Sequence, residues 1–319
     1  MKDIKNILLY FYGINISDIS CNNTSYSFYI DYNLYFLTKI IRPYKEVIAI
    51  NELLMSYKNN YHKMIINKFG NYISEVKNQG YVLLKTEYPL HKEIDLRDII
   101  YNQKVVQNYK VLNRTNYEEL WSSKVDYLEY QINELGLNYK IIKNSYNYYI
   151  GLAENAIHYF NLINTNNEKL VISTKRIYYP NYSKDYYNPL NIVIDYRIRD
   201  IAEYIKASFF KGINVLDELK SVIELNTLSD IEYSLLYARL LFPTYYFDLV
   251  GYILENNMNE SKLLDILDKA SEYEEFLKEV YILINKKTAI TAIDWLNRWI
   301  HYFFNILNFF FYCFKQSKF

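Results

Sequence analysis

The feature that most constrains the fold is a change in hydrophobic pattern near residue 90. Before this point, short runs of Tyr, Phe, Ile, Leu and Val alternate with turn residues, which is typical of β-strands. A helix is expected to begin at Pro43, because apolar residues then recur at helical spacing. The expected strands are Tyr26–Ile30, Leu34–Ile40, Met64–Ile66, Tyr72–Val76 and Tyr81–Lys85. This order predicts a small antiparallel sheet with one helix across it.

After residue 90 the pattern is mainly helical. Thr115 and Glu118 have the spacing of a capping box, so a helix is predicted to begin with Thr115 as its cap. Ser229 and Glu232 repeat this signature, and Pro243 is expected to kink or end the helix that follows. These patterns predict a larger, helical second part of the chain.

Two short β-like segments, residues 169–173 and 191–195, interrupt the helical part. A long helix from Ser145 to about Ile163 is expected before them, and a Tyr-rich loop joins them. The chain is therefore predicted to be α+β, with a small antiparallel β lobe carrying one helix and a larger, mainly helical lobe.

The balance of charge argues against one class of partner. The chain has 36 Lys and Arg against 36 Asp and Glu, whereas proteins that bind nucleic acid normally carry a basic excess. No nucleic-acid partner is therefore expected. The 38 tyrosines have two explanations that stay open, the codon usage of an AT-rich genome and a surface suited to assembly interfaces.

Cysteines and the two ends of the chain indicate the compartment. Cys21 and Cys313 form neither a disulfide framework nor a metal-ligand spacing, which favours a reducing environment. The apolar run Ile7–Tyr12 is too short for a signal-peptide core, so the protein is expected to be cytoplasmic at synthesis. The aromatic C-terminal tail, residues 298–319, contains polar interruptions and is not expected to span a membrane. Docking on the body of the protein is the favoured interpretation, and contact with a membrane or a partner is the alternative.

Three segments carry a resemblance to a known family. They are residues 121–131, 151–157 and 188–204. In order and spacing they resemble the spore coat proteins of the CotS/YutH type, within the aminoglycoside phosphotransferase branch of the protein-kinase-like superfamily. The resemblance implies a kinase-like two-lobe fold, with lobes at residues 1–88 and 89–297 before the tail. It also implies a spore coat location, with other spore coat proteins as partners.

Phosphoryl transfer in such a fold needs a fixed set of parts: a strand lysine with a helix glutamate, a catalytic aspartate, magnesium ligands and a glycine-rich loop. The resemblance places Asp195 where the metal-binding aspartate would lie. It places Asp200 where a structural aspartate braces the catalytic loop. The alternatives are a strand-end aspartate that faces solvent or caps a turn for Asp195, and an ordinary helix cap for Asp200.

The catalytic loop departs from the family pattern. Ser173 stands where a histidine is required, and Lys175 stands where the aspartate base is required. A lysine is cationic at neutral pH and does not accept a proton without a large pKa shift. Pro180 stands where the loop asparagine belongs, although Asn181 is adjacent. No catalytic residue is therefore predicted.

The nucleotide-binding parts are equally incomplete. No glycine lies between Ile14 and Lys39, so no glycine-rich loop is available to cover phosphates. Lys39 and Glu52 are vestigial candidates for binding a cofactor, and Asp195 is the corresponding vestigial candidate for a metal. A surface lysine is the favoured interpretation of Lys39. Lys175 with Arg176 offers an anion-binding pair, but adjacent cations are usually just solvated.

These observations predict a non-catalytic kinase-like (pseudokinase) protein of the spore coat that needs no cofactor. Tyr182, Tyr186 and Tyr187 are expected at its surface, where they would contact partner proteins. The alternative is a small-molecule phosphotransferase that uses ATP, magnesium at Asp195 and a base such as Asp185. A nucleotide-binding sensor that uses the cleft between the lobes is a further alternative.

Overall fold

The computed structural model describes residues 2–22, 25–57, 59–86, 91–107, 109–135, 138–166, 168–224 and 228–293. The chain divides into two compact units. Unit 1 contains Met1–Thr115 and Lys169–Tyr204, and unit 2 contains Asn116–Glu168 and Ile205–Phe319. The lobe boundary between residues 88 and 89 stays a prediction. The predicted tail at residues 298–319 lies outside the described residues.

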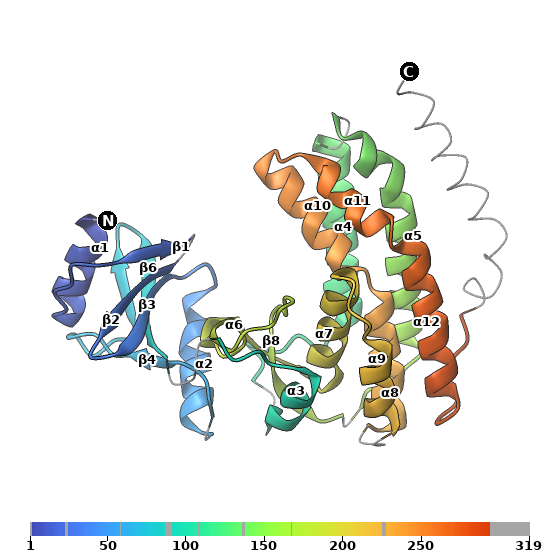
Figure 1. Ribbon diagram of the computed structural model, residues 1–319, viewed down its shortest axis with the longest axis horizontal. Coiled ribbons are helices and arrows are strands. Elements are labelled where there is room, and N and C mark those ends of the chain that lie inside the picture. Colours follow the sequence, from blue (N-terminus) through green and yellow to red (C-terminus); the bar gives the residue numbers. More distant parts are fainter. Residues whose placement is uncertain are drawn as a thin grey trace. The chain divides into compact units, whose positions relative to one another are not determined.

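Unit 1 begins with an antiparallel sheet (Figure 1). The described strands run in the order β1-β2-β3-β6-β4, and β5 also pairs with β6. Their bounds are β1 Ser20–Asn22, β2 Ser25–Ile30, β3 Asn33–Lys39, β4 Lys63–Ile65, β5 Ile73–Val76 and β6 Gln79–Lys85. Asp31 and Tyr32 join β2 to β3 with φ angles of 46° and 64°, the left-handed values that a tight hairpin turn requires. The five predicted strands are thus confirmed, and β1 is additional.

The two faces of this sheet bury different helices. On one face, Leu37 and Leu83 pack with residues of α1 (Lys2–Ile7) and of the π-helical turn η1 (Leu8–Tyr12), which the sequence pattern does not predict. On the other face, Val82 and Leu84 pack with Val47 of α2 (Tyr44–Met55). This division follows from the alternation of side chains along β6.

Helix α2 also packs against a second sheet of unit 1. This sheet has the order β7-β8-β9, with β7 Val105–Val106, β8 Leu170–Thr174 and β9 Ile192–Tyr196. Ile50 and Leu53 of α2 share one core cluster with Ile172 and Ile194. The predicted strand pair is confirmed, and α3 (Leu96–Asn102) precedes β7.

The Tyr-rich loop between β8 and β9 contains α6 (Ser183–Tyr186) and the 3-10 turn η3 (Pro189–Asn191). Main-chain bonds hold both its ends: the Ser183 N–H donates to the Lys92 carbonyl at 2.8 Å, and the His62 N–H donates to the Tyr187 carbonyl at 3.0 Å. These bonds hold the loop against other parts of unit 1, and Tyr186 and Tyr187 turn inward.

The expected surface position of the loop tyrosines is therefore wrong for two of them. Tyr186 and Tyr187 are 5% and 3% exposed, whereas Tyr182 is partly exposed. Their rings contact each other with centroids 5.2 Å apart, and Tyr61 meets Tyr187 edge-on at 5.8 Å. Tyr186 and Tyr187 are core residues of unit 1, not an interface.

Unit 2 is helical. Helix α7 (Ile198–Phe210) begins in unit 1 and ends in unit 2. The other described elements are α4 Tyr117–Leu135, α5 Lys140–Asn161, α8 Leu216–Glu224, α9 Asp230–Leu241, α10 Thr244–Asn256, η4 Glu260–Leu263, α11 Leu264–Leu267 and α12 Ala270–Asn285. Within the described ranges, no helix combines the length and hydropathy that crossing a membrane requires.

The helix caps confirm one sequence prediction and correct another. Ser229 and Glu232 form the expected capping box, and α9 ends at Leu241, two residues before Pro243. At α4, however, the cap is Asn116, whose side chain accepts the Glu119 N–H at 3.4 Å and donates to the Glu119 carboxylate at 2.7 Å.

Thr115 is unavailable as that cap because it is bonded elsewhere. Its N–H and hydroxyl both donate to Oδ1 of Asn113, at 2.8 and 2.7 Å. The start of the second long helix also differs from the prediction, since α5 begins at Lys140, five residues before Ser145.

Aromatic side chains build much of the core of unit 2. The Trp121 ring stacks on Tyr117 and Phe242, with centroids 4.6 and 4.5 Å apart. Tyr149 stacks on Tyr246 at 3.8 Å. Part of the tyrosine content therefore serves internal packing, where a ring supplies a large apolar area.

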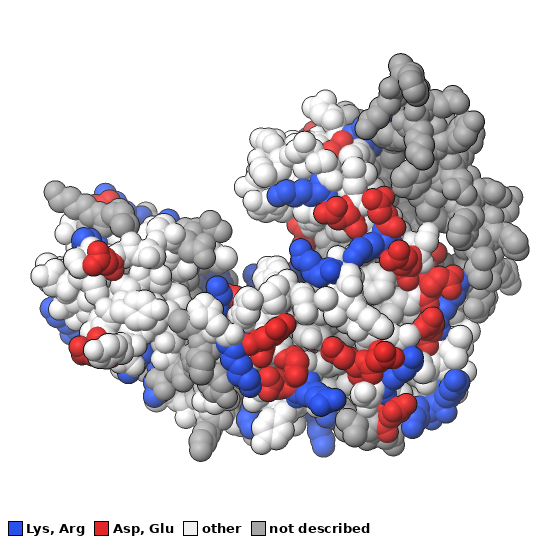
Figure 2. Space-filling model, viewed as in Figure 1, with Lys and Arg blue, Asp and Glu red and all other residues white. Residues whose placement is uncertain are grey.

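Charge is mixed over the surface. Figure 2 shows Lys and Arg interspersed with Asp and Glu on the face that is drawn, in line with a net charge of zero for the chain. A local excess of one sign must therefore be identified from the contacts of particular residues.

Candidate functional site

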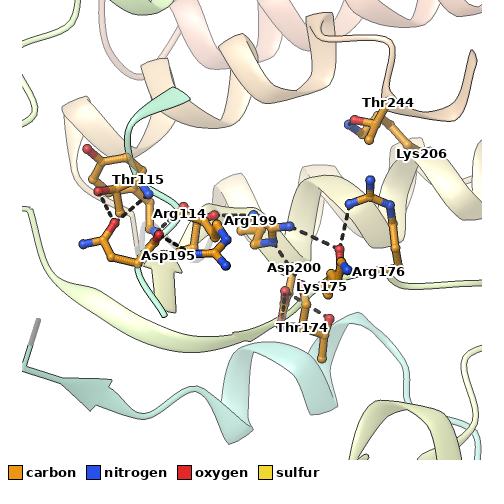
Figure 3. Close-up of polar contacts among 12 residues, drawn as sticks. Arg114, Thr115, Thr174, Lys175, Arg176, Asp195, Arg199, Asp200, Lys206 and Thr244 are labelled. Atoms are coloured by element: carbon orange, nitrogen blue, oxygen red, sulfur yellow. Dashed lines mark hydrogen bonds and ion pairs between the residues drawn. The ribbon is translucent and has the colours of Figure 1, made fainter. Parts of the chain in front are cut away.

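The candidate site lies in unit 1, where β8, β9 and the start of α7 meet (Figure 3). β9 ends at Tyr196 and α7 begins at Ile198, so one residue, Arg197, joins the strand to the helix. This short junction keeps Asp195 on the strand close to Arg199 and Asp200 in the first turn of the helix.

Asp195 forms a buried ion pair with Arg199. The Asp195 side chain is 0% exposed and that of Arg199 is 6% exposed. Nη1 of Arg199 donates to Oδ2 of Asp195, and the Tyr196 N–H donates to Oδ1 at 2.7 Å. The interpretation of Asp195 as a solvent-facing strand end is wrong, because the carboxylate is enclosed and neutralised.

Arg199 also ties the two strands together. Its Nε donates to the Thr174 carbonyl at 3.0 Å, and its Nη2 donates to the Lys175 carbonyl at 3.2 Å. One guanidinium therefore binds the end of β8 and the carboxylate of β9, as Figure 3 shows. A planar group with several fixed donors suits this role.

Asp200 braces the end of β8. It is 1% exposed, and both of its carboxylate oxygens accept the Thr174 N–H, at 3.0 and 3.2 Å. The Thr174 hydroxyl donates to the same carboxylate at 3.3 Å. These bonds match the bracing role predicted for this aspartate. Burial raises the pKa of Asp200 to about 7, although the bond from Thr174 and the charge of Arg199 oppose the shift.

The structure shows the surroundings of the residues at the predicted catalytic-loop positions. The Ser173 hydroxyl is buried and has no hydrogen-bond partner among the described residues. The side chain of Lys175 is exposed. Asn181, adjacent to Pro180, is 4% exposed, and its amide donates to the Ile94 carbonyl at 3.2 Å. Asn181 therefore holds the loop to the segment before α3.

The predicted cofactor residues are not joined to each other. Lys39 ends β3 and Glu52 is exposed on α2, and no hydrogen bond or ion pair links them in the described part of the chain. Glu46 of α2 makes the ion pairs instead, with Arg42 at 2.6 Å and with Arg114 at 2.9 Å. Burial by itself would raise the pKa of Glu46, but the bonds to Arg42 and Arg114 lower it below its usual value.

Arg42 and Arg114 are site residues that sequence reasoning missed. Arg42 and Glu46 have the i, i+4 spacing of a helical ion pair, which is a usable signal. Arg114 lies 68 residues from Glu46 in sequence, so nothing local could have predicted its contact. Both guanidinium groups lie near Lys175. Desolvation, followed by the charges of Arg176 and Arg42, lowers the pKa of the Lys175 amine.

The residues around Asp195 do not fit a magnesium ion. Magnesium takes oxygen ligands in near-octahedral geometry, whereas the neighbour of Asp195 is a guanidinium. Within the described ranges, no three His, Cys, Asp or Glu side chains gather to hold a metal. Asp185, the alternative base, lies on α6; desolvation raises its pKa, against the charges of Lys184 and His62.

Comparison with known proteins identifies the family. Residues 5–280 match the sequence profile of the family described as "Spore coat putative kinase YutH". The chain belongs to this family. The endospore coat-associated protein YutH of Bacillus subtilis (strain 168) is 26% identical over 329 residues, covering 90% of this chain and 96% of that protein. The resemblance seen in the sequence is thereby confirmed.

Solved structures with the same fold are phosphotransferases. An aminoglycoside phosphotransferase from Alicyclobacillus acidocaldarius matches with a TM-score of 0.59 and 8% identity, over 85% of this chain and 93% of that one. A spectinomycin phosphotransferase solved with ADP and spectinomycin matches with a TM-score of 0.56 and 13% identity, over 88% and 98%. This member of the YutH family therefore has the kinase-like fold that was predicted.

Proposed function

We propose that this protein is a non-catalytic, kinase-like component of the spore coat that acts through contacts with other coat proteins. Membership of the YutH family and the coat-associated relative from Bacillus subtilis support the location. The ion pair that holds Asp195, and the lysine at position 175 where the family pattern has its aspartate base, support the lack of phosphoryl transfer.

The observation that carries the proposal is the ion pair between Asp195 and Arg199. A magnesium-bound nucleotide needs a carboxylate at this position to balance the charge of the metal. In this chain the Arg199 guanidinium already balances the charge of the Asp195 carboxylate, and both groups are buried. A further unit charge at about 4 Å from the guanidinium would be repelled by roughly 4 kcal/mol at an effective dielectric constant of about 20. A divalent cation would meet about twice that repulsion.

Lys175, at the predicted position of the general base, also supports a non-catalytic protein. A general base must be unprotonated when its substrate arrives, and Lys175 carries a proton in its ordinary state. The lowered pKa of Lys175 is the one observation that favours the alternative, because a lysine needs a shift in that direction to act as a base. The predicted alternative is a small-molecule phosphotransferase with a base such as Asp185, and the shift at Lys175 favours a form of it in which this lysine is the base.

Thermal unfolding with millimolar ATP and magnesium tests the proposal. A nucleotide that binds the folded chain at about a hundredfold excess over its Kd would stabilise it by about 2.7 kcal/mol. We expect no rise in Tm and no formation of ADP, while a spectinomycin phosphotransferase handled in parallel with spectinomycin as the acceptor shows both. An Asp195→Asn variant is the matched control, because it removes the candidate metal ligand and keeps its shape.

A magnesium-dependent rise in Tm that Asp195→Asn abolishes would contradict the proposal and establish a nucleotide-binding cleft. Phosphate transfer that Lys175→Met abolishes would establish the phosphotransferase. A rise in Tm without any transfer would identify a nucleotide sensor.

A further inference from the structure

Four cationic side chains from three separate parts of the sequence gather near the end of β8. They are Arg42, Arg114, Lys175 and Arg176, here called the cation cluster. All four belong to unit 1. The charges of Arg42, Arg114 and Arg176 all act on the Lys175 ammonium.

Main-chain contacts fix this arrangement. Nη1 of Arg42 donates to the carbonyls of Leu190 and Ile192, at 2.8 and 3.0 Å. The Lys175 N–H donates to the carbonyl between them, that of Asn191, at 2.6 Å. Arg42 and Lys175 are therefore held by three consecutive carbonyls at the start of β9.

The opposite side of the cluster is fixed as well. The Arg114 N–H donates to the Ile194 carbonyl of β9 at 2.9 Å, and Arg114 shares the carboxylate of Glu46 with Arg42. The guanidinium of Arg42, the backbone of Lys175, and both the backbone and the guanidinium of Arg114 are thus held by contacts within unit 1.

The cluster carries an excess of positive charge. Glu46 is the carboxylate among the groups that act most strongly on Lys175, beside the three cations Arg176, Arg42 and Arg114. Cations therefore outnumber carboxylates among these groups, in a chain whose net charge is zero. Both oxygens of Glu46 are used by Arg42 and Arg114, so this carboxylate does not compensate the charge of Lys175.

The charged groups differ in what they offer to a ligand. The side chains of Arg42 and Glu46 are only 9% and 12% exposed, so Arg42 contributes to the local field and not to direct contact. Arg114 is 30% exposed. Lys175 is exposed, and its ammonium makes no hydrogen bond or ion pair with the described residues. Tyr178, three residues after Lys175, is 68% exposed.

We propose that the cation cluster is the docking site for an acidic segment of a partner protein. The proposal rests on the proposed function, in which this chain works through contacts with other proteins. Lys175 and Arg114 would bind carboxylates, and the exposed ring of Tyr178 would pack against the aliphatic parts of the same segment. Complementary charge of this kind sets the specificity and the rate of association.

An acidic peptide fits this surface better than the phosphates of a nucleotide. Nucleotide phosphates in this fold are covered by backbone N–H groups of a glycine-rich loop, and the hairpin β2–β3 contains no glycine. A carboxylate-rich peptide needs only cationic side chains at the surface, which the cluster supplies.

The test is the binding of a fluorescently labelled oligo-glutamate peptide to the full-length chain, measured by anisotropy, with an oligo-glutamine peptide as the neutral probe. We expect the glutamate peptide to bind and the glutamine peptide not to bind. A Lys175→Glu variant should weaken binding about tenfold or more, since the exposed ammonium has no internal contact to lose. Raising the salt concentration should weaken binding to the unmodified chain, because exposed charges are screened.

The matched control is the double variant Arg97→Ala, Lys104→Ala. Both side chains are exposed in unit 1, and neither is among the groups that act most strongly on Lys175. This control removes two positive charges and should leave the affinity within about twofold. A double variant Lys175→Ala, Arg176→Ala provides a second measurement, with its fold checked by circular dichroism.

Equal affinity for Lys175→Glu and the unmodified chain would overturn the proposal, as would equal losses in the control. Displacement of the peptide by millimolar ATP without magnesium would also overturn it and assign the cluster to a phosphate ligand. None of these outcomes depends on phosphoryl transfer. Failure here is therefore distinguishable from failure of the proposed function.

Discussion

Removing the Arg199 guanidinium tests the physical basis of the proposed function directly. In an Arg199→Met variant, Asp195 keeps its place at 0% exposure but loses the cation that neutralises it. Methionine retains most of the length and apolar volume of the arginine stem, so the change is chiefly one of charge and hydrogen bonding.

The expected cost follows from the burial of the pair. Breaking a buried ion pair by removing one partner usually costs about 3–5 kcal/mol, because an uncompensated charge is left behind. The bonds from Arg199 to the carbonyls of Thr174 and Lys175 are lost too. We therefore expect the free energy of unfolding to fall by about 4 kcal/mol in Arg199→Met.

A second substitution tests whether the lost stability comes from the uncompensated charge of Asp195. Asp195→Asn in the Arg199→Met background removes the stranded charge, while the asparagine oxygen can still accept the Tyr196 N–H. The double variant should therefore be more stable than Arg199→Met alone, with a coupling energy of about 1–3 kcal/mol. The control is Lys92→Met, which breaks the exposed pair with Asp98 and should cost less than about 1 kcal/mol.

Urea unfolding followed by far-ultraviolet circular dichroism measures all five proteins: the unmodified chain, Arg199→Met, Asp195→Asn, their double variant and Lys92→Met. If Arg199→Met loses no more stability than Lys92→Met, the guanidinium is not what neutralises Asp195, and the argument against a metal at this position fails. If the double variant is less stable than Arg199→Met by the full cost of Asp195→Asn, the two residues act independently.

Two further predictions concern Asp200 and the start of α4. Because burial raises the pKa of Asp200 in the folded chain to about 7, above its unfolded value of about 4, the folded state binds the extra proton. The free energy of unfolding should thus fall as the pH rises from about 4 to 7, by on the order of 1 kcal/mol per pH unit at most, and then level off. An Asp200→Asn variant should lose this dependence in urea titrations across the same range, and an unchanged slope would contradict the assignment. Asn116→Ala should lower the stability of the chain by about 1 kcal/mol through loss of the α4 cap. Thr115→Ala, the cap that sequence spacing favours, should cost less, and the reverse order of the two melting temperatures would count against Asn116 as the cap.

The strands and the overall class of fold could be predicted because their signals are local. The short apolar run Tyr81–Lys85 after a turn at Asn78–Gly80 identifies β6 without knowledge of any neighbour. The capping box at Ser229 was equally readable. The cap of α4 was misplaced by one residue, because Thr115 and Asn116 are both good caps and only the contact with Asn113 removes Thr115 from the choice.

The chemical character of the site was only partly readable. The lysine at position 175 and the serine at position 173 are plain in the sequence, and so is the missing glycine-rich loop. The ion pair between Asp195 and Arg199 could not be predicted from the sequence. A spacing of four residues brings two side chains together only when the backbone between them turns in the right way. The one-residue junction between β9 and α7 supplies that turn.

The burial of the loop tyrosines was beyond sequence reasoning for a different reason. Tyr186 and Tyr187 lie among polar residues and prolines, a composition typical of exposed loops. Their loop turns inward because its main chain bonds to the segment near Lys92 and to His62, and both contacts span long separations in sequence. No local pattern encodes such a contact.

The sequence by itself therefore determined the class of fold, the family and most of the strands and helices, and it predicts the loss of the catalytic aspartate, since each depends on residue types and their spacing. The tertiary structure alone decided that Arg199 neutralises Asp195, that Asp200 braces Thr174, and that Arg42 and Arg114 join Lys175 in one cluster. The physical reason is that charge interactions act through space. Their partners are chosen by packing, which brings together groups that the sequence keeps far apart.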